Sequence, residues 1–431
     1  MPGAGAALAR DHNVDRIEAP VTFKAYLMCA FAAFGGIFFG YDSGYINGIM
    51  GMKYFIQEFG NGGATISPST KSLIVAILSV GTFLGARELS GKSQQNQADE
   101  ILVIAGDLAD SFGRRTTIIL GCAIFCVGAA LQCASTASNM LVGGRFVAGL
   151  GVGFVSAIII LYMSEVAPRK VRGAIVSAYQ FCITIGIMLA SVVTYGTQDF
   201  TNSGSYRIPI GIQFVWALIL GIGLFLLPES PRYYVRHSEV DKATQVLARV
   251  RGQPETSSYV TEELAEIVAN HEYEMQAVPR TGYFSSWANC FRGSINKPNS
   301  NLRRTVLGTS LQMMQQWTGV NFIFYYSTTF FQLLNLDVDP FLLSLVTTIV
   351  NVVSTPISFW TIERFGRRPL LIWGALGMVI CQYIVAIAGT VAGNDKAVVK
   401  VEIAFVCIYI FFFASTWYVL NLRKHVHTDT I

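Results

Sequence analysis

An aspartate lies inside an apolar segment near the start of the chain. Asp42, in the stretch FFGYDSGY, is the only charged residue between Lys24 and Lys53. A carboxylate in such a segment is a candidate functional group, provided that an opposite charge can reach it. Arg145, in the apolar run GGRFVAGLG, is the obvious partner, because an arginine does not discharge itself by losing a proton. The alternative role is a structural ion pair that joins two segments.

Uncharged amides form a second set of candidates. Gln180, Gln315, Gln316 and Asn321 all lie in apolar segments. An amide both donates and accepts hydrogen bonds, which suits a ligand that is rich in hydroxyl groups. The last three would not share one face of a regular helix, whereas a broken or wide-turn helix near Gly319 would allow them to lie together. The alternative role is hydrogen bonding between helices.

Other chemistry has little support in the sequence. Seven of the eight cysteines lie in apolar segments, as buried inert thiols do, and the five histidines are scattered without metal-ligand spacing. No apolar segment holds a nucleophile beside a base. We therefore expect a protein that is not an enzyme and that binds no cofactor, metal or nucleic acid.

Long apolar helices are the elements that must position these residues. The chain has 431 residues, of which 52% are hydrophobic and only 13% charged, against roughly 25% charged in a soluble protein. About 20 apolar residues suffice to cross a bilayer as a helix. Ten membrane spans are predicted. Nine are continuous apolar segments near Ala25–Met50, Thr117–Ala134, Leu141–Met163, Ala174–Thr194, Ile208–Leu227, Val306–Phe331, Phe341–Thr361, Leu370–Val391 and Ile403–Leu420. The tenth starts at Ser72 and is interrupted after Ala86.

Basic residues gather in alternate loops. Residues 135–140 carry no charge, and residues 334–340 carry only Asp337 and Asp339. Positively charged loops face the cytoplasm in membrane proteins. The N-terminus is therefore predicted to be cytoplasmic, together with the basic loops around Arg114/Arg115, Arg169/Lys170/Arg172, Arg232–Arg251, Arg303/Arg304 and Arg364/Arg367/Arg368.

One hexapeptide occurs twice. DSFGRR at residues 110–115 recurs as ERFGRR at residues 363–368, each at the end of the second helix of a predicted six-helix half. The acid can pair with an arginine while the glycine permits a tight turn. Two copies in corresponding positions predict the duplicated architecture of a membrane transporter.

Seven motifs extend this pattern from about residue 20 to residue 417. They are GGIFFGYDSGYINGIM (35–50), GDLADSFGRR (106–115), GRFVAGLGVG (144–153), SEVAPRKVRG (164–173), PESPRYYV (228–235), QQWTGVNFIFYYS (315–327) and ERFGRRP (363–369). Jointly they resemble the sugar porter family of the major facilitator superfamily, most closely the fungal hexose transporters. The resemblance implies an all-α polytopic membrane protein with the major facilitator fold.

The implied domains follow the two halves of that fold. A cytoplasmic tail at 1–20 precedes a six-helix bundle at 21–228, a cytoplasmic helical linker at 229–301, a partial bundle of about four helices at 302–420 and an aberrant tail at 421–431.

Two segments depart from the family pattern. The polar stretch at 87–103 interrupts the second helix, and after residue 417 the chain reads YVLNLRKHVHTDTI where the family continues with a Gly-Pro-Gly motif and two more helices. Both are predicted to be retained introns; a divergent isoform is the alternative. Because charges within a span are costly, we expect the polypeptide as written to transport poorly or not at all.

The resemblance also implies roles for individual residues. Asp42 would carry a proton and Arg145 would compete with that proton. The sugar would contact Gln180, Gln315, Gln316, Asn321, Asn351 and Phe39, and Tyr325 and Tyr326 would form a gate, unless these two are only core aromatics. The cytoplasmic salt-bridge set would comprise Asp110, Arg114, Arg115, Glu165, Arg172, Glu229, Arg232, Glu363, Arg367 and Arg368.

The implied function is transport of a monosaccharide, a hexose such as glucose, by alternating access. The expected partners are the sugar, a proton and the lipid bilayer, and the expected form is a monomer in the plasma membrane. The same motifs occur in facilitative hexose uniporters and in transporter-like glucose sensors, so both alternatives stay open.

Overall fold

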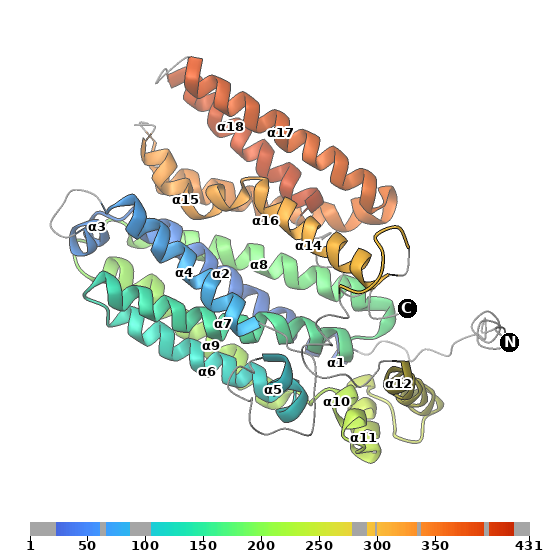
Figure 1. Ribbon diagram of the computed structural model, residues 1–431. Coiled ribbons are helices and arrows are strands. Elements are labelled where there is room, and N and C mark those ends of the chain that lie inside the picture. The colour runs from blue at the N-terminus through green and yellow to red at the C-terminus, as the bar shows by residue number, and fades with distance from the viewer. Residues whose placement is uncertain are drawn as a thin grey trace.

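The computed structural model describes residues 23–60, 66–86, 105–277, 291–297, 300–333, 338–391 and 396–417. The predicted tails at 1–20 and 421–431 and the insertion at 87–103 lie outside these ranges. Within them the regular elements are helices, and no strand occurs (Figure 1). The first half contains α1 (Phe23–Ala33), α2 (Gly35–Ile49), α3 (Lys53–Phe59), α4 (Pro68–Ala86), α5 (Ala105–Phe112), α6 (Arg114–Cys133), α7 (Ser138–Val166), α8 (Arg169–Thr197) and α9 (Gly204–Leu226).

Among the described residues, three helices follow the first half and five form the second. The connecting helices are α10 (Pro231–Arg236), α11 (Val240–Arg251) and α12 (Ser258–Ala277). The second half contains α14 (Asn301–Trp317), α15 (Val320–Leu333), α16 (Pro340–Phe365), α17 (Arg367–Val391) and α18 (Lys396–Phe412), and α18 continues into a π-helical turn, Phe413–Trp417.

Membrane-spanning helices dominate the described residues, where nine are long and apolar enough to cross a bilayer. The first of these combines α1 and α2 into one span, Ala25–Ile49. The predicted span at Val306–Phe331 is not a single helix, because it divides into α14 and α15. Gly319 lies at the division with φ +84°, a conformation that glycine adopts without steric cost. The predicted break near Gly319 is confirmed.

Local sequence explains where several helices begin. Asp339 caps α16 by accepting the backbone N–H of Phe341 at 3.0 Å, and Pro340 occupies the first turn. Ser230 caps α10 in the same way ahead of Pro231. Both pairings satisfy N–H groups that a helix leaves free, with proline where no donor is needed.

The two halves lie side by side. In Figure 1, α14 to α18 (orange to red) run along one side of the bundle formed by α1 to α9, and α10 to α12 lie at one end of that bundle. Glycines permit close packing of the helices inside the first half: a Cβ at Gly40 would collide with the backbone of Ile183, and one at Gly149 with the backbone of Leu78. Small residues at helix contacts are typical of membrane bundles.

Candidate functional site

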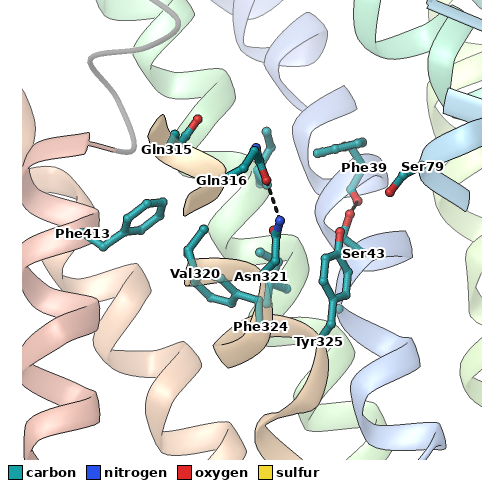
Figure 2. Close-up of a pocket in the computed structure, with 13 residues that line it drawn as sticks. Phe39, Ser43, Ser79, Gln315, Gln316, Val320, Asn321, Phe324, Tyr325 and Phe413 are labelled. Atoms are coloured by element: carbon teal, nitrogen blue, oxygen red, sulfur yellow. Dashed lines mark hydrogen bonds between the residues drawn. The ribbon is translucent and has the colours of Figure 1, made fainter. Parts of the chain in front are cut away.

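A cavity of about 300 Å³ lies between the two halves. Its walls come from α2, α4 and α8 of the first half, from α14 and α15 of the second, and from the π-helical turn after α18 (Figure 2). This volume is at the lower end of the range for small-molecule sites. The cavity therefore suits a small ligand.

One wall of the cavity is made of amides. Gln315 and Gln316 come from the last turn of α14, and Asn321 comes from the first turn of α15. The break at Gly319 turns all three toward the same space, and the Asn321 amide donates to Oε1 of Gln316 (Figure 2). The predicted grouping of Gln315, Gln316 and Asn321 is present in the structure.

Two side chains of the second half hold this break in place. Gln382 Nε2 donates to the Thr318 carbonyl oxygen at 2.6 Å, and the Tyr409 hydroxyl donates to the same oxygen at 2.9 Å. A carbonyl released by a helix break needs such donors in a membrane. The carbonyl that the break releases is thus satisfied by side chains of α17 and α18.

Aromatic side chains form other parts of the cavity wall. Phe39 and Tyr325 both line it, and the Tyr325 hydroxyl lies at Ser43 (Figure 2). Tyr326 does not line this cavity, and its ring packs against Phe322 with 6.3 Å between centroids. The predicted gate pair is therefore divided between the cavity and the packing around it.

Two predicted sugar-binding amides do not line this cavity. Gln180 is buried on α8, and Asn351 is fully buried on α16. Neither amide atom of Asn351 has a hydrogen-bond partner among the described residues. Their predicted contact with a sugar stays a prediction.

Asp42 and Arg145 are both fully buried, and they do not form an ion pair in the described part of the chain. Neither carboxylate oxygen of Asp42 has a hydrogen-bond partner there. The Arg145 guanidinium instead donates to the Tyr45 hydroxyl at 2.6 Å and to the Ile74 carbonyl at 2.8 Å. The expected direct pair is thus absent from this conformation, in which Tyr45 takes Nη1, Ile74 takes Nε, and Nη2 has no hydrogen-bond partner among the described residues.

Hydrogen bonds join the halves at the end near α3. Asn47 donates from Nδ2 to the hydroxyls of Ser327 at 2.7 Å and Ser344 at 3.0 Å, and its Oδ1 accepts the Thr328 backbone N–H at 3.1 Å. Gln198 also donates across the halves to Asp339 at 2.6 Å. These bonds must break if the halves separate at this end.

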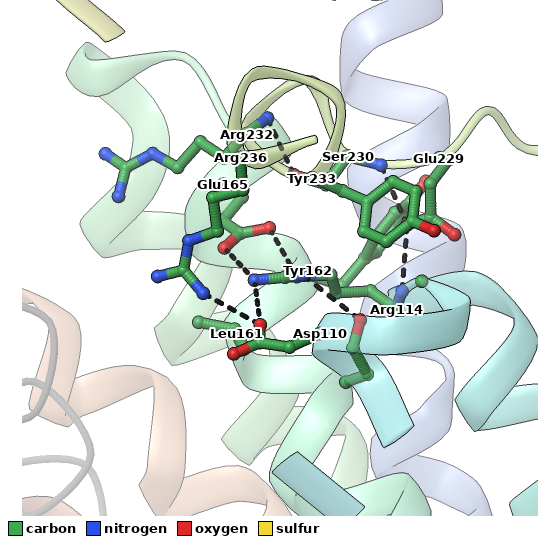
Figure 3. Close-up of polar contacts among 12 residues, drawn as sticks. Asp110, Arg114, Leu161, Tyr162, Glu165, Glu229, Ser230, Arg232, Tyr233 and Arg236 are labelled. Carbon is green, nitrogen blue, oxygen red and sulfur yellow. Dashed lines mark hydrogen bonds and ion pairs between the residues drawn. The ribbon is translucent and has the colours of Figure 1, made fainter. Parts of the chain in front are cut away.

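The opposite end of the first half, where α5 and α10 lie in Figure 1, carries a cluster of charged residues that Figure 3 shows in close-up. Arg114 is fully buried, and its guanidinium contacts Asp110 at 3.0 Å and Glu165 at 3.1 Å. Its Nη1 also donates to the Ala109 carbonyl. Charge-assisted bonds of this kind are strong when the remaining donors are satisfied. Three helices, α5, α6 and α7, are thereby fastened at this end.

Glu229 completes this cluster. Its carboxylate accepts the backbone N–H groups of Arg114 at 3.0 Å, Arg115 at 3.0 Å and Ser230 at 2.9 Å, and it therefore caps the start of α6. Burial raises the pKa of Glu229 above its usual range, and the three backbone donors oppose that shift.

Other members of the predicted salt-bridge set behave differently. Arg232 forms no ion pair among the described residues, and Arg236 pairs with Asp110 at 2.7 Å in its place. The Arg115 guanidinium donates to the Phe225 carbonyl, and only the backbone N–H of this residue reaches the Glu229 carboxylate. The side chains of Arg172 and Glu363 lie outside the described residues, and Arg367 and Arg368 have no ion pair within them.

Comparison with solved structures defines the class of protein. XylE from E. coli, a xylose transporter in a partially occluded inward open conformation, superposes with a TM-score of 0.72 at 22% identity, over 94% of this chain and 88% of XylE. A structure of XylE described as a proton:xylose symporter bound to 6-bromo-6-deoxy-D-glucose also gives a TM-score of 0.72. The chain has the all-α polytopic major facilitator fold.

Sequence comparison then gives the family. The model of the family described as "Sugar (and other) transporter" matches residues 28–420, and the chain belongs to that family. Its members are transporters rather than enzymes.

Three curated fungal relatives are similar over most of this chain. The major facilitator-type transporter ecdD of Aspergillus rugulosus is 43% identical over 92% of this chain, and the probable glucose transporter rco-3 of Neurospora crassa is 42% identical over 94%. The high glucose sensor RGT2 of Saccharomyces cerevisiae is 39% identical over 91%. The chain spans 71%, 64% and 48% of the lengths of these three proteins.

Proposed function

We propose that this protein carries a monosaccharide across the membrane by alternating access. The amide-lined cavity between the two halves is the observation that carries this proposal. Gln315, Gln316 and Asn321 offer both donors and acceptors to the hydroxyl groups of a sugar, and Phe39 and Tyr325 offer ring faces. The hydrogen bonds from Asn47 to the second half then belong to one of the two states that alternate.

A hexose is the proposed substrate and a proton is the proposed co-substrate. Relatives named as glucose transporters support the hexose, and XylE, named as a proton:xylose symporter, supports coupling. Within this chain, the carboxylate of Asp42 is fully buried and has no hydrogen-bond partner among the described residues, which supports proton binding, since an ionisable group inside a membrane needs a functional reason.

The orientation, location and organisation follow the same proposal. The end that carries Arg114, Arg115 and Arg236 faces the cytoplasm by the positive-inside rule. Residues 21–228 form the first bundle, 229–301 the cytoplasmic linker and 302–420 the second bundle. The protein acts as a monomer in the plasma membrane.

Glucose sensing is the second candidate function, and the identity of 39% to RGT2 favours it. A sensor of this fold would bind sugar in the same cavity without moving it. Net uptake therefore separates the two functions, whereas sugar binding alone does not.

Labelled-glucose uptake by proteoliposomes that contain the full chain tests the proposal. Gln316→Ala removes an amide from the cavity and is expected to raise the half-saturating glucose concentration about tenfold. Gln57→Ala, an exposed amide on α3, is the matched control and should change nothing. A chain without residues 87–103 is measured beside the wild type, since that insertion is expected to slow uptake.

Two results would contradict transport. Saturable glucose binding without uptake in either chain would favour the sensor, and the absence of both binding and uptake would reject a sugar site at this cavity.

A further inference from the structure

We propose that Tyr45 is a positioning residue that holds Arg145 away from Asp42 and thereby sets the pH at which Asp42 takes up its proton. This inference rests on the proposed proton coupling. Asp42 and Arg145 belong to that coupling, whereas Tyr45 adds a neutral hydroxyl that competes for the arginine.

The guanidinium of Arg145 is held by two neutral oxygens. Nη1 donates to the Tyr45 hydroxyl oxygen at 2.6 Å, and Nε donates to the Ile74 carbonyl oxygen of α4 at 2.8 Å. The guanidinium carbon also lies 5.4 Å from the centre of the Tyr45 ring, within the range of a cation–π contact. The α2 and α4 helices thus hold the arginine by Nη1 and Nε without a carboxylate, and Nη2 has no hydrogen-bond partner among the described residues.

Gln132 determines which way the Tyr45 hydroxyl points. The hydroxyl donates its single proton to Oε1 of Gln132 at 2.5 Å, and so its lone pairs are left to accept from Arg145. The Gln132 amide is itself oriented, because its Nε2 donates to the Gly144 carbonyl at 3.5 Å. All three side chains are fully buried. A chain of hydrogen bonds thus runs from α6 through α2 to α7.

Asp42 lies three residues before Tyr45 on α2, on the same face of the helix. Among the described residues, Arg145 is the charged group that acts on Asp42. The other ionisable groups around Asp42 and Arg145 are three phenols, those of Tyr41 and Tyr45 on α2 and of Tyr325 on α15. The Tyr41 hydroxyl is occupied elsewhere, since it donates to the Pro209 carbonyl at 3.0 Å. Asp42 itself forms neither an ion pair nor a hydrogen bond through its carboxylate within the described residues.

Arg145 therefore has two alternative acceptors. While Tyr45 and the Ile74 carbonyl hold it, the buried Asp42 carboxylate has no ion-pair partner within the described residues. Such a carboxyl group holds a proton more readily than one in an ion pair. Once Arg145 turns to Asp42, the ion pair displaces that proton. The Tyr45 hydroxyl biases this two-state element toward the protonated form.

The pH dependence of labelled-glucose uptake tests the role of Tyr45. Tyr45→Phe removes the hydroxyl, frees the guanidinium for Asp42 and should move the pH of half-maximal uptake down by about one unit. Tyr41→Phe removes a buried hydroxyl from the same helix without touching Arg145 and should leave the profile in place. Maximal rates and melting temperatures are recorded for both variants, so that structural damage is distinguished from a shift in pH.

The failure of this inference is distinct from the failure of proton coupling. Suppose that wild-type uptake depends on pH and that Asp42→Asn abolishes this dependence. If Tyr45→Phe then keeps the wild-type pH profile, only the role of Tyr45 is overturned. If wild-type uptake is independent of pH, the proposed coupling fails and the inference fails with it. Should Tyr45→Phe not fold, Gln132→Leu releases the hydroxyl and should give a smaller downward shift, whose absence would overturn the inference.

Discussion

The two copies of the repeated hexapeptide make the same turn in different surroundings. Gly113 between α5 and α6 has φ +96°, and Gly366 between α16 and α17 has φ +76°. Around the first copy, Arg114 is fully buried and contacts two carboxylates. Around the second, Arg368 is exposed, and neither Arg367 nor Arg368 forms an ion pair within the described residues.

This difference separates what the hexapeptide does by itself from what its partners add. The glycine and the following helix start are present in both copies, so the motif is sufficient for the turn. The cluster at the first copy needs Glu165 from the end of α7 and Glu229 from the segment after α9. The ion cluster at the first copy therefore combines Asp110 of the hexapeptide with two carboxylates that are distant in sequence.

The largest difference in stability is expected when Arg114 and Arg367, the first arginines of the two copies, are replaced. Arg114→Ala leaves the buried Glu165 carboxylate, whose side chain is 2% exposed, without its counter-ion, and removing one partner of a buried pair costs about 3–5 kcal/mol. Arg367→Ala at the second copy should cost less than about 1 kcal/mol. Thermal unfolding of the purified protein in detergent measures both. Equal losses would show that the two copies contribute alike.

A smaller difference in stability is expected when Gly113 and Gly366, the glycines of the two copies, are replaced. Alanine at either position must adopt a positive φ, which costs about 1–2 kcal/mol. A Cβ at Gly113 would also collide with the Glu229 carboxylate, whereas one at Gly366 meets open space. Gly113→Ala should therefore destabilise the protein by about 1 kcal/mol more than Gly366→Ala, as measured from their free energies of unfolding. A larger loss at Gly366 would contradict this ordering.

Much of the fold follows from the sequence, because hydropathy and spacing depend on short stretches of chain. Runs of apolar residues predicted the spans, and the unequal faces of Gln315, Gln316 and Asn321 predicted the break that the structure shows at Gly319. The predicted span at Val306–Phe331 is accordingly divided into α14 and α15.

The partners of buried polar groups were harder to predict, since they depend on how the helices are rotated. A carboxylate seemed the natural partner for Arg145, but a tyrosine hydroxyl and a backbone carbonyl occupy it. Asn47 was not predicted, although it is an amide in an apolar segment and therefore carries the same signal as Gln180. Its contacts with α15 and α16 arise only from the docking of the two halves.

Proton movement during sugar uptake is the most direct test of coupled transport through Asp42. Proteoliposomes that contain the full chain and an enclosed pH-sensitive dye are given glucose at equal internal and external pH. The account predicts that the lumen acidifies as glucose enters, that Asp42→Asn abolishes the acidification, and that Glu58→Gln, an exposed acid on α3, preserves it. Glucose entry without acidification in the wild type, or acidification that survives Asp42→Asn, would contradict the account.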